Sequence, residues 1–533
     1  MLSVFVLLTV FRMVVLPVQF EDRELATSRA QQEKLVRQMQ DYFDRQFAVS
    51  GTTFRFELAP TVTLGHPAGW YGANYPDRKD IRLADAVREA CQQVNDRVDF
   101  STFDGDGDGM VDGVFLLFAG PGEHASGVES DIYPQQGRIS ADGSALAIDS
   151  RTVDRFAAAP EGEPGVGCHE IGHLLGLPDL YDTDGAESGG ECAGLDGTSI
   201  MDLGCRQADF PGFGAVEYHL LGLGRSETLK TGSYVLTPLA MGQRYLRAET
   251  DRKDEYFLFE ARKGELLIYH IDRSANPAGY SSRQKKDLKA SERWELGEVN
   301  NNPEHPCARL VRLPGADGAD SFGSDTPAAF RAWSGAASGL ALTGIRPAAD
   351  GAVAFDVIRP ITLADLVVYQ DAALLRWTPD PALTDIQSWE ISWSDGVSQG
   401  SATLPADTRS YTLEGLLPRT EYTFCVRARC AATGLHSTGG RFTTKILRKG
   451  TYPYIYLGDA TRNVDGSFPA GSKLPLRVFN ATDVAEVHWT LDGAPVGPDA
   501  DGFFAVRRSG VLRAKILYTD GTSETLLKEI NVR

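Results

Sequence analysis

At 533 residues the chain is too long for a single hydrophobic core, so three or four domains are expected. A hydrophobic fraction of 42% and a charged fraction of 23% are those of globular proteins and argue against a disordered chain. The net charge of −19 argues against a nucleic-acid-binding protein, because phosphate binding needs a surplus of Lys and Arg.

The first ten residues, MLSVFVLLTV, are apolar enough for the core of a signal peptide. They lack a basic leader and a small-residue cleavage site, and Arg12 interrupts the run. We therefore favour a buried first strand over an export signal, which leaves a signal segment incomplete or absent in this chain. No later apolar run reaches the length of a membrane span, so we expect no transmembrane anchor.

The odd number of cysteines means that at least one is unpaired or pairs outside the chain. Cys192–Cys205 and Cys425–Cys430 are the candidate bridges nearest in sequence, although spacing does not fix connectivity. Cysteine usage leans mildly toward an oxidising compartment. The seven cysteines are Cys91, Cys168, Cys192, Cys205, Cys307, Cys425 and Cys430.

The first predicted domain spans residues 1–225 and is of the α/β (α+β) class, because strand-like and helix-like segments alternate from about residue 12 onward. Apolar and β-branched content predicts strands at RMVVLPVQF, TFRFELAPTVTL and GVFLLFAG. Helical spacing of apolar residues predicts helices at LVRQMQDYFDRQF and LADAVREACQQVNDRV.

An acidic loop, FDGDGDGMVDG, precedes one of these strands and resembles part of a calcium loop. Four carboxylates at loop positions 1, 3, 5 and 9, with the Met110 carbonyl, suit calcium, which takes six to eight oxygens. Position 12 is Phe115 rather than Glu, so Asp99 or Glu123 would have to complete the shell. The alternative is a solvated Asp/Gly turn. We favour structural calcium, because carboxylates this close repel without a counter-ion. The four residues are Asp104, Asp106, Asp108 and Asp112.

The strongest motif is GCHEIGHLLGLPDLYD. On a helix, His169 and His173 lie one turn apart on one face, so both imidazoles reach a single zinc ion. Glu170 lies beside them, where its carboxylate accepts a proton from metal-bound water. Gly176 permits a sharp turn at the helix end, after which Asp179 returns as an oxygen ligand.

Chance is a poor explanation of this pattern. With 9 His in the chain, an H-E-x-x-H match arises by chance on the order of once in a hundred such chains. Gly and Asp at fixed offsets make it roughly a hundredfold rarer. The alternative, two ordinary helix histidines followed by a capping Asp, requires three coincidences. The sequence therefore predicts a catalytic zinc centre.

The rest of the chain is predicted to be strand-rich. Residues 226–358 predict a β-rich domain with a long irregular stretch around 275–335. Residues 359–446 resemble a fibronectin type III domain, with Trp377 as the core aromatic and Tyr422 as the tyrosine corner. Residues 447–533 resemble an immunoglobulin-like or PKD-like β-sandwich. No catalytic cluster is visible in these two domains, which are interpreted as an adhesion or spacing module.

HExxHxxGxxD, followed by TSIMDLG, resembles the immune inhibitor A-like family of metallopeptidases, relatives of the metzincins. DYF, LFAGPGE, FGAVEYHLLGL and EYFLFEAR stand in the order of that family, so the resemblance covers roughly residues 12–358. Two departures occur. Gln135 stands where the family often has a His, so no function is carried over for it. The segment before Gly264 is shorter than usual, which alters a wall outside the metal shell.

The resemblance implies zinc held by His169, His173 and Asp179, with Glu170 as general base. Met201 matches the Met-turn beneath the metal; otherwise it is a plain core methionine. A hydroxyl or imidazole donor to the tetrahedral intermediate is also expected. The candidates, left open, are Tyr181, Tyr218 and His219.

The implied activity is that of a secreted zinc endopeptidase cleaving extracellular proteins or peptides. We expect a monomer, secreted or at the cell surface, whose C-terminal domains bind extracellular protein or glycan ligands. The alternative is a cell-surface adhesin with an inactive peptidase domain, and a further one is a zinc hydrolase for non-peptide substrates. Intact His169, Glu170, His173 and Asp179 argue against the adhesin.

Overall fold

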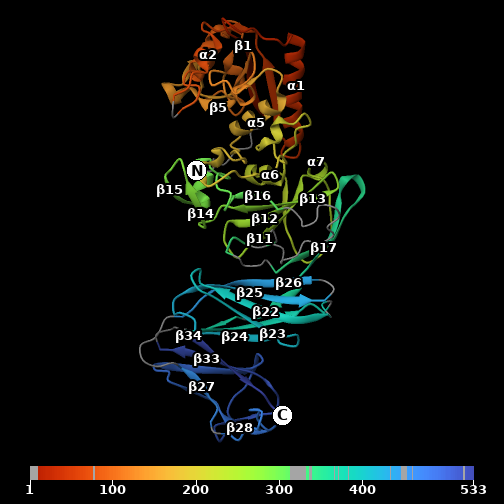
Figure 1. Cartoon of the computed structure of the whole chain (residues 1–533), viewed down its shortest axis with the longest axis vertical. Coiled ribbons are helices and arrows are strands. Elements are labelled where there is room, and N and C mark those ends of the chain that lie inside the picture. Colours follow the sequence, from red (N-terminus) through yellow and green to blue (C-terminus); the bar gives the residue numbers. More distant parts are fainter. Residues whose placement is uncertain are drawn as a thin grey trace. The chain divides into compact units, whose positions relative to one another are not determined.

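The computed structural model describes residues 10–75, 78–311, 330, 332–334, 339–364, 366–369, 371–381, 383, 385–431, 434–445, 453–458, 460–519 and 523–533. The chain divides into two compact units, Met1–Arg359 and Pro360–Arg533 (Figure 1). The apolar start considered as a signal core lies almost wholly outside the described residues. Among those described, no helix has the length and apolar character needed to cross a membrane.

A mixed sheet forms the centre of the N-terminal part of the first unit. Its order is β2-β1-β4-β8-β5, with β3 beside β1, and β5 is an antiparallel edge on otherwise parallel strands. The predicted strands RMVVLPVQF and GVFLLFAG are confirmed as β1 and β4. The strands are β1 (Val10–Gln19), β2 (Thr53–Leu58), β3 (Val62–Thr63), β4 (Gly113–Phe118), β5 (Gln135–Arg138) and β8 (Arg155–Pro160), and a separate pair is β6 (Leu146–Ile148) with β7 (Arg151–Val153).

Helices cover both faces of this sheet. Met13 and Val15 of β1 point into a core with α1 (Arg29–Gln46) and α5 (Pro164–Leu174), while Val14 and Leu16 point into a core with α3 (Leu83–Val94). Because successive side chains of a strand face opposite ways, a strand buried on both sides is apolar at nearly every position. The shorter helices are α2 (Ala68–Tyr71), α4 (Glu123–Ser126) and α6 (Ala215–Leu221).

The remainder of the first unit is strand-rich. A five-stranded sheet, β16-β13-β12-β11-β9, packs against a three-stranded sheet, β10-β18-β17, around apolar residues such as Phe257, Phe259 and Phe355. The strands are β9 (Arg225–Thr228), β10 (Gly232–Leu236), β11 (Arg244–Glu249), β12 (Glu255–Arg262), β13 (Glu265–Asp272), β16 (Ala308–Leu310), β17 (Ala341–Pro347) and β18 (Val353–Ile358), with the helix α7 (Leu239–Gly242).

One predicted irregular region is ordered. Between residues 277 and 296 the chain forms the hairpin of β14 (Pro277–Ser281) and β15 (Lys286–Lys289), then α8 (Ala290–Leu296). The Lys289 amide donates to Glu292 Oε2 at 2.7 Å and Gly297 ends the helix with a φ of 69°. A helix this short gives no periodic signal, so the expectation of irregular structure was wrong here. Much of 312–335 lies outside the described residues.

The two parts of the first unit share a core. Tyr256 and Leu258 of β12 and Tyr269 of β13 belong to the same apolar cluster as α1 and α5. A boundary between 225 and 226 would therefore cut through one continuous core, and it stays a prediction. Because this core is continuous, the strand-rich part packs against the elements that carry α5 and helps to hold that helix in place.

The second unit begins with two sheets that pack as a β-sandwich around Trp377 and Trp389. The tyrosine corner is confirmed, because the Leu417 amide donates to the Tyr422 hydroxyl at 2.9 Å. One sheet contains β19 (Ile361–Leu363), β20 (Val367–Val368), β21 (Ala372–Pro379) and β24 (Ser410–Glu414), and the other β22 (Ile386–Ser394), β23 (Gln399–Pro405), β25 (Glu421–Cys430) and β26 (Gly434–Thr443).

A further set of strands completes the second unit. Its largest sheet, β31-β30-β33-β34, buries Leu512, Ala514 and Ile516 of β33. The strands are β27 (Tyr454–Tyr456), β28 (Ser472–Pro475), β29 (Arg477–Phe479), β30 (Val484–Leu491), β31 (Ala494–Pro495), β32 (Phe503–Val506), β33 (Gly510–Tyr518) and β34 (Ser523–Ile530).

Neither candidate disulfide forms. Cys192 and Cys205 are free thiols. Cys425 and Cys430 lie five residues apart on β25, so their side chains point to opposite faces of the strand. Their Cα atoms are separated by about 16 Å along it. Because bridged Cα atoms lie within about 7 Å of each other, this pairing is excluded.

Candidate metal centre

Helix α5 carries the predicted site and is buried along almost its whole length. Pro164 occupies its first turn, where the absent N–H costs nothing. The helix ends at Leu174, and Gly176 then takes a φ of +94°, which only glycine adopts without strain. This reversal brings Asp179 back toward the two histidines.

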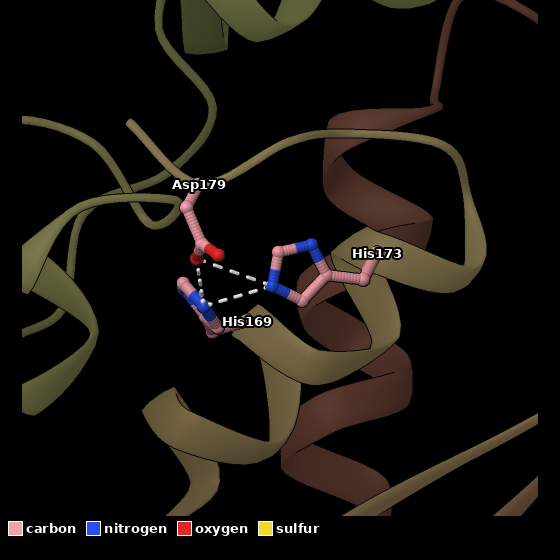
Figure 2. Close-up of side chains that lie close together, drawn as sticks. All are labelled: His169, His173 and Asp179. Atoms are coloured by element: carbon pink, nitrogen blue, oxygen red, sulfur yellow. Dashed lines mark hydrogen bonds and ion pairs between the residues drawn. The ribbon is translucent and has the colours of Figure 1, made fainter. Parts of the chain in front are cut away.

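Three side-chain atoms converge at the end of α5, as Figure 2 shows. His169 Nε2 lies 3.1 Å from Asp179 Oδ1, and His173 Nε2 lies 3.3 Å from the same oxygen. The two Nε2 atoms are 3.1 Å apart, and the imidazole planes are nearly perpendicular, at 89°. All three predicted zinc ligands are thus brought together.

Backbone carbonyls fix which ring nitrogens carry hydrogen. His169 Nδ1 lies 2.8 Å from Ile200 O, and His173 Nδ1 lies 2.8 Å from Leu177 O. A carbonyl only accepts, so each Nδ1 donates, and a neutral imidazole then presents a lone pair at Nε2. Two imidazolium rings this close would repel each other. Two Nε2 atoms and a carboxylate oxygen therefore face one another, and with both rings neutral this donor set fits a divalent cation such as zinc.

Met201 lies directly beneath the helix. It is fully buried, and a Cβ added to Gly172 would meet its Sδ at 2.5 Å. The Leu180 amide donates to Met201 O at 2.8 Å, which ties the Met201 loop to the segment that carries Asp179. Glycine at 172 is therefore what allows the methionine to approach the turn between the two histidines.

Glu170 is buried, with 4% of its surface exposed, and faces the same pocket as the three converging residues. It is not a member of the converging set. Burial raises the pKa of Glu170 above its ordinary value. A carboxylate with a raised pKa is a stronger proton acceptor than an exposed one.

The pocket around these residues has a volume of about 450 Å³. Its far wall was not predicted, because Trp294 and Glu295 of α8 lie in the region expected to be irregular. An aromatic–acid pair within a short helix gives no local signal that it faces a distant helix. Residues lining the pocket outside the motif are Lys79, Tyr133, Pro134, Gln135, Gln136, Tyr181, Trp294, Glu295 and Gly297.

Two parts of the chain are similar to known protein families. Residues 19–215 match the family model of the immune inhibitor A peptidase M6 catalytic domain, and residues 365–441 match that of the fibronectin type III domain. This match covers 197 of the 533 residues and, together with the metalloprotease relatives, supports a peptidase in this part of the chain. The cluster of His169, His173 and Asp179, which could hold a metal ion, supports the same assignment.

The similarities to individual proteins are partial. Immune inhibitor A of Bacillus thuringiensis subsp. alesti is 28% identical, with 27% of this chain and 25% of that protein covered. The pre-pro-metalloprotease PrtV of Vibrio cholerae serotype O1 (strain M66-2) is 29% identical, with 27% of this chain and 19% of that protein covered. A solved fibronectin type III domain of human collagen alpha-1(XX) is 22% identical, covering 17% of this chain and 87% of that one with a TM-score of 0.15.

Among the candidate donors, only Tyr181 lines the pocket of the peptidase domain. Its ring centroid lies 6.0 Å from that of His169, and burial raises its pKa, so the phenol keeps its proton. The Tyr218 hydroxyl instead donates to Gln46 O at 3.0 Å. His219 lies 3.2 Å from the Tyr245 hydroxyl and is likewise outside the pocket lining.

The two departures from the family pattern have different consequences. Gln135 lines the pocket, and its side-chain amide donates to Asp80. The shortened segment forms a two-residue turn between β12 and β13, where Lys263 and Gly264 have φ values of 52° and 84°. This turn does not line the pocket, so the expected effect on substrate fit has no support.

The acidic loop is only partly assembled as expected. Asp104, Asp106 and Asp108 bring carboxylate oxygens within 4.8 Å of one another. Asp112 stands apart, because its Oδ2 accepts from the Arg12 amide at 2.7 Å. Arg151 Nε lies 2.7 Å from Asp104 Oδ2 and supplies a positive charge that the repulsion argument had overlooked.

Neither residue expected to complete a calcium shell joins this group. Asp99 accepts from the Ser101 amide at 2.9 Å, and Glu123 pairs with Lys79 at 2.6 Å. The remaining carboxylate contacts are local: the Gly107, Asp108 and Met110 amides donate to the loop aspartates at 2.7 to 3.1 Å. The loop therefore has a stable arrangement of its own.

Asp80 supports the pocket wall and gives a testable pH dependence. Its buried carboxylate accepts from the Tyr133 amide at 2.9 Å, and burial raises its pKa from 3.8 to about 7. The folded protein therefore binds this proton more tightly than the unfolded chain. Its contribution to stability is complete below the unfolded pKa and is lost as pH rises through about 7.

We expect the free energy of unfolding of the wild type to fall, relative to Asp80→Asn, as pH rises from 5 to 8. The maximum slope is about 1.4 kcal/mol per pH unit, the value for one proton. Urea unfolding of both proteins across this range measures the difference. Parallel curves for the two proteins would show that Asp80 is ionised in the fold throughout.

Proposed function

We propose that the chain is a zinc-dependent endopeptidase of metzincin-like architecture that hydrolyses extracellular proteins or peptides. His169, His173 and Asp179 would hold zinc, and Glu170 would be the general base. The observation that carries the proposal is the convergence of two Nε2 atoms and one carboxylate oxygen at distances of 3.1 to 3.3 Å. The antiparallel edge strand β5, which contributes Gln135 and Gln136 to the pocket, supports the architecture.

The chemistry follows from the roles of the chain's own side chains. Zinc, when bound, polarises the scissile carbonyl and lowers the pKa of the attacking water. Glu170 takes the proton of that water and returns it to the leaving amine. The Ile200 and Leu177 carbonyls keep His169 and His173 in the tautomer that exposes Nε2. The Tyr181 hydroxyl donates to the oxyanion that develops on the carbonyl.

The proposal extends to location and organisation. We place the protein outside the cell, secreted or at its surface, as a monomer. Four domains are proposed, at 1–225, 226–358, 359–446 and 447–533. The fibronectin type III match at 365–441 supports a role for the C-terminal part in binding extracellular protein or glycan ligands.

The rival function is a surface adhesin whose peptidase domain is inactive. Incubating the purified chain with casein or gelatin and sequencing the products by mass spectrometry separates the two. We expect fragments cut at internal peptide bonds, and their loss with a zinc chelator. Substrate that remains intact beside a zinc-loaded chain would refute the peptidase and favour the adhesin. Release of only a non-peptide group would favour a different zinc hydrolase.

Calcium at the acidic loop stays part of the proposal, held by Asp104, Asp106 and Asp108 with Asp112 as an outer neighbour. Binding to the folded state alone stabilises it by about 2.7 kcal/mol at a concentration 100-fold above Kd. We expect calcium to raise the Tm of the zinc-loaded protein and magnesium to raise it less. An Asp106→Asn variant should lose the response. Equal Tm values with and without calcium would identify the loop as a solvated turn held by Arg151.

A further inference from the structure

The loop of residues 198–201 lies beneath the metal centre. A buried carboxylate on another element, α6, holds it in place. Glu217 of α6 is fully buried and accepts from the Ser199 hydroxyl. Ser199 Oγ in turn accepts from the Met201 amide at 2.9 Å. The second oxygen of Glu217 accepts from the Gly214 amide at 2.9 Å, so both of its oxygens are used.

The same loop is also held by the strand-rich part of the first unit. Arg262 of β12 donates to Thr198 O and lies 2.6 Å from Glu260 Oε1. Glu260 is fully buried, accepts from the Ala215 amide at 2.5 Å and from the Tyr269 hydroxyl at 3.2 Å. Every oxygen of this carboxylate is therefore satisfied, and the guanidinium is directed at the loop.

Burying these charged groups costs free energy, because they lose their contacts with water. This cost argues that the groups have a role beyond filling space. Two buried carboxylates lie near one guanidinium: Glu260 pairs with Arg262 directly, and the charge of Glu217 also acts on it. Burial raises the pKa of Glu260. Burial by itself would lower the pKa of Arg262, but the charge of Glu260 and those of the neighbouring acidic groups together outweigh it and raise the pKa overall. Buried ion pairs of this kind seldom stabilise a fold more than apolar residues of equal volume would.

The loop reaches the metal ligands at two points. Ile200 O accepts the Nδ1–H of His169 at 2.8 Å, and Met201 O accepts from the Leu180 amide at 2.8 Å, next to Asp179. Arg262 and Glu217 bind Thr198 and Ser199, the two residues before Ile200. The Ser199 hydroxyl also accepts from the amide of Met201, the residue after Ile200. A displaced Ile200 carbonyl would release the His169 ring and its tautomer.

We propose that Glu217 and Arg262 are positioning residues of the metal centre, acting through loop 198–201 on His169 and Asp179. The strand-rich segment 226–358 is then part of the catalytic apparatus, since it supplies Arg262 and Glu260. This inference rests on the proposed zinc peptidase function.

The test measures metal binding as well as activity in the full-length chain. The variants are Glu217→Gln, Arg262→Lys and Arg262→Ala, with Ser199→Ala as the mildest change. Loss of a group that orients a ligand typically weakens metal affinity or activity by about 10- to 100-fold. We expect this loss in zinc affinity by chelator competition, a changed visible spectrum of the Co²⁺-loaded protein, and a lower kcat at nearly unchanged KM. Arg262→Lys should retain more of the zinc affinity and of kcat than Arg262→Ala. The lysine ammonium can reach Thr198 O or Glu260, although not both.

Arg244→Lys is the matched control. Arg244 lies in the same sheet and pairs with Glu227 at 2.8 Å, away from loop 198–201. The Arg244→Lys substitution should leave the zinc affinity, the Co²⁺ spectrum and kcat unchanged. Variants that lose thermal stability but keep the wild-type zinc affinity, Co²⁺ spectrum and kcat would overturn the positioning role. If Glu217→Gln does not fold, the Ser199→Ala variant tests the positioning role with the same three measurements.

A wild type that neither binds zinc nor cleaves protein would instead refute the proposed function itself.

Discussion

Replacing Glu170 by Gln leaves zinc bound and reduces kcat for protein hydrolysis by about 10²- to 10⁴-fold, the usual contribution of general acid–base catalysis. The amide keeps the shape of the side chain but neither accepts the proton of the attacking water nor returns it. Because Glu170 is not one of the three converging ligands, zinc affinity should stay close to that of the wild type. KM should change little, since the loss is confined to the transition state.

Steady-state kinetics on a quenched peptide, with zinc content measured on the same sample, check this result. Glu129→Gln is a suitable control, because Glu129 is exposed and outside the pocket lining. A Glu170→Gln protein that cleaves at the wild-type rate would remove Glu170 from the mechanism. One that has lost its zinc would place Glu170 among the ligands.

Replacing His173 by Ala weakens zinc binding by about two to three orders of magnitude and abolishes hydrolysis. Structural zinc sites with four ligands bind with about 10–16 kcal/mol, so one ligand accounts for about 2.5–4 kcal/mol. Asp179→Ala should behave similarly, because its Oδ1 completes the set. Chelator competition measures the affinities directly.

His488→Ala is the control for the loss of a histidine as such, since His488 lies on β30 in the second unit with about half of its side chain exposed. It should bind zinc as the wild type does. Undiminished zinc affinity in both His173→Ala and Asp179→Ala would place the metal elsewhere. Loss of zinc in only one of them would mean that the other is not a ligand.

The candidate metal centre was predictable because its geometry is local. His169 and His173 lie on one helical face, and Gly176 reverses the chain within a single turn to return Asp179. These relations depend only on helix pitch and on glycine's freedom at positive φ. The buried strands β1 and β4 were predictable for a related reason, since a strand covered on both faces must be apolar throughout.

What was missed depends on tertiary contacts. Trp294 reaches the pocket only because the tertiary fold brings α8 to the pocket that α5 lines, and no local pattern predicts that. Asp112 does not join the other three loop aspartates, because its carboxylate accepts a hydrogen bond from the Arg12 amide of β1. A signal did exist for Glu217 and Glu260, which are charged residues within the largely apolar segments FGAVEYHLLGL and EYFLFEAR. Isolated charges in such positions indicate buried pairing, but they do not name the partner.

Titrating the metal-free chain with zinc while following casein cleavage tests the central claim most directly. The proposed function predicts no cleavage without metal, and a rise in activity that saturates at one zinc per chain. Glu170→Gln should bind the same one equivalent without recovering activity. Full cleavage by the metal-free chain, or a wild type that takes up one zinc and cleaves nothing, would contradict the account.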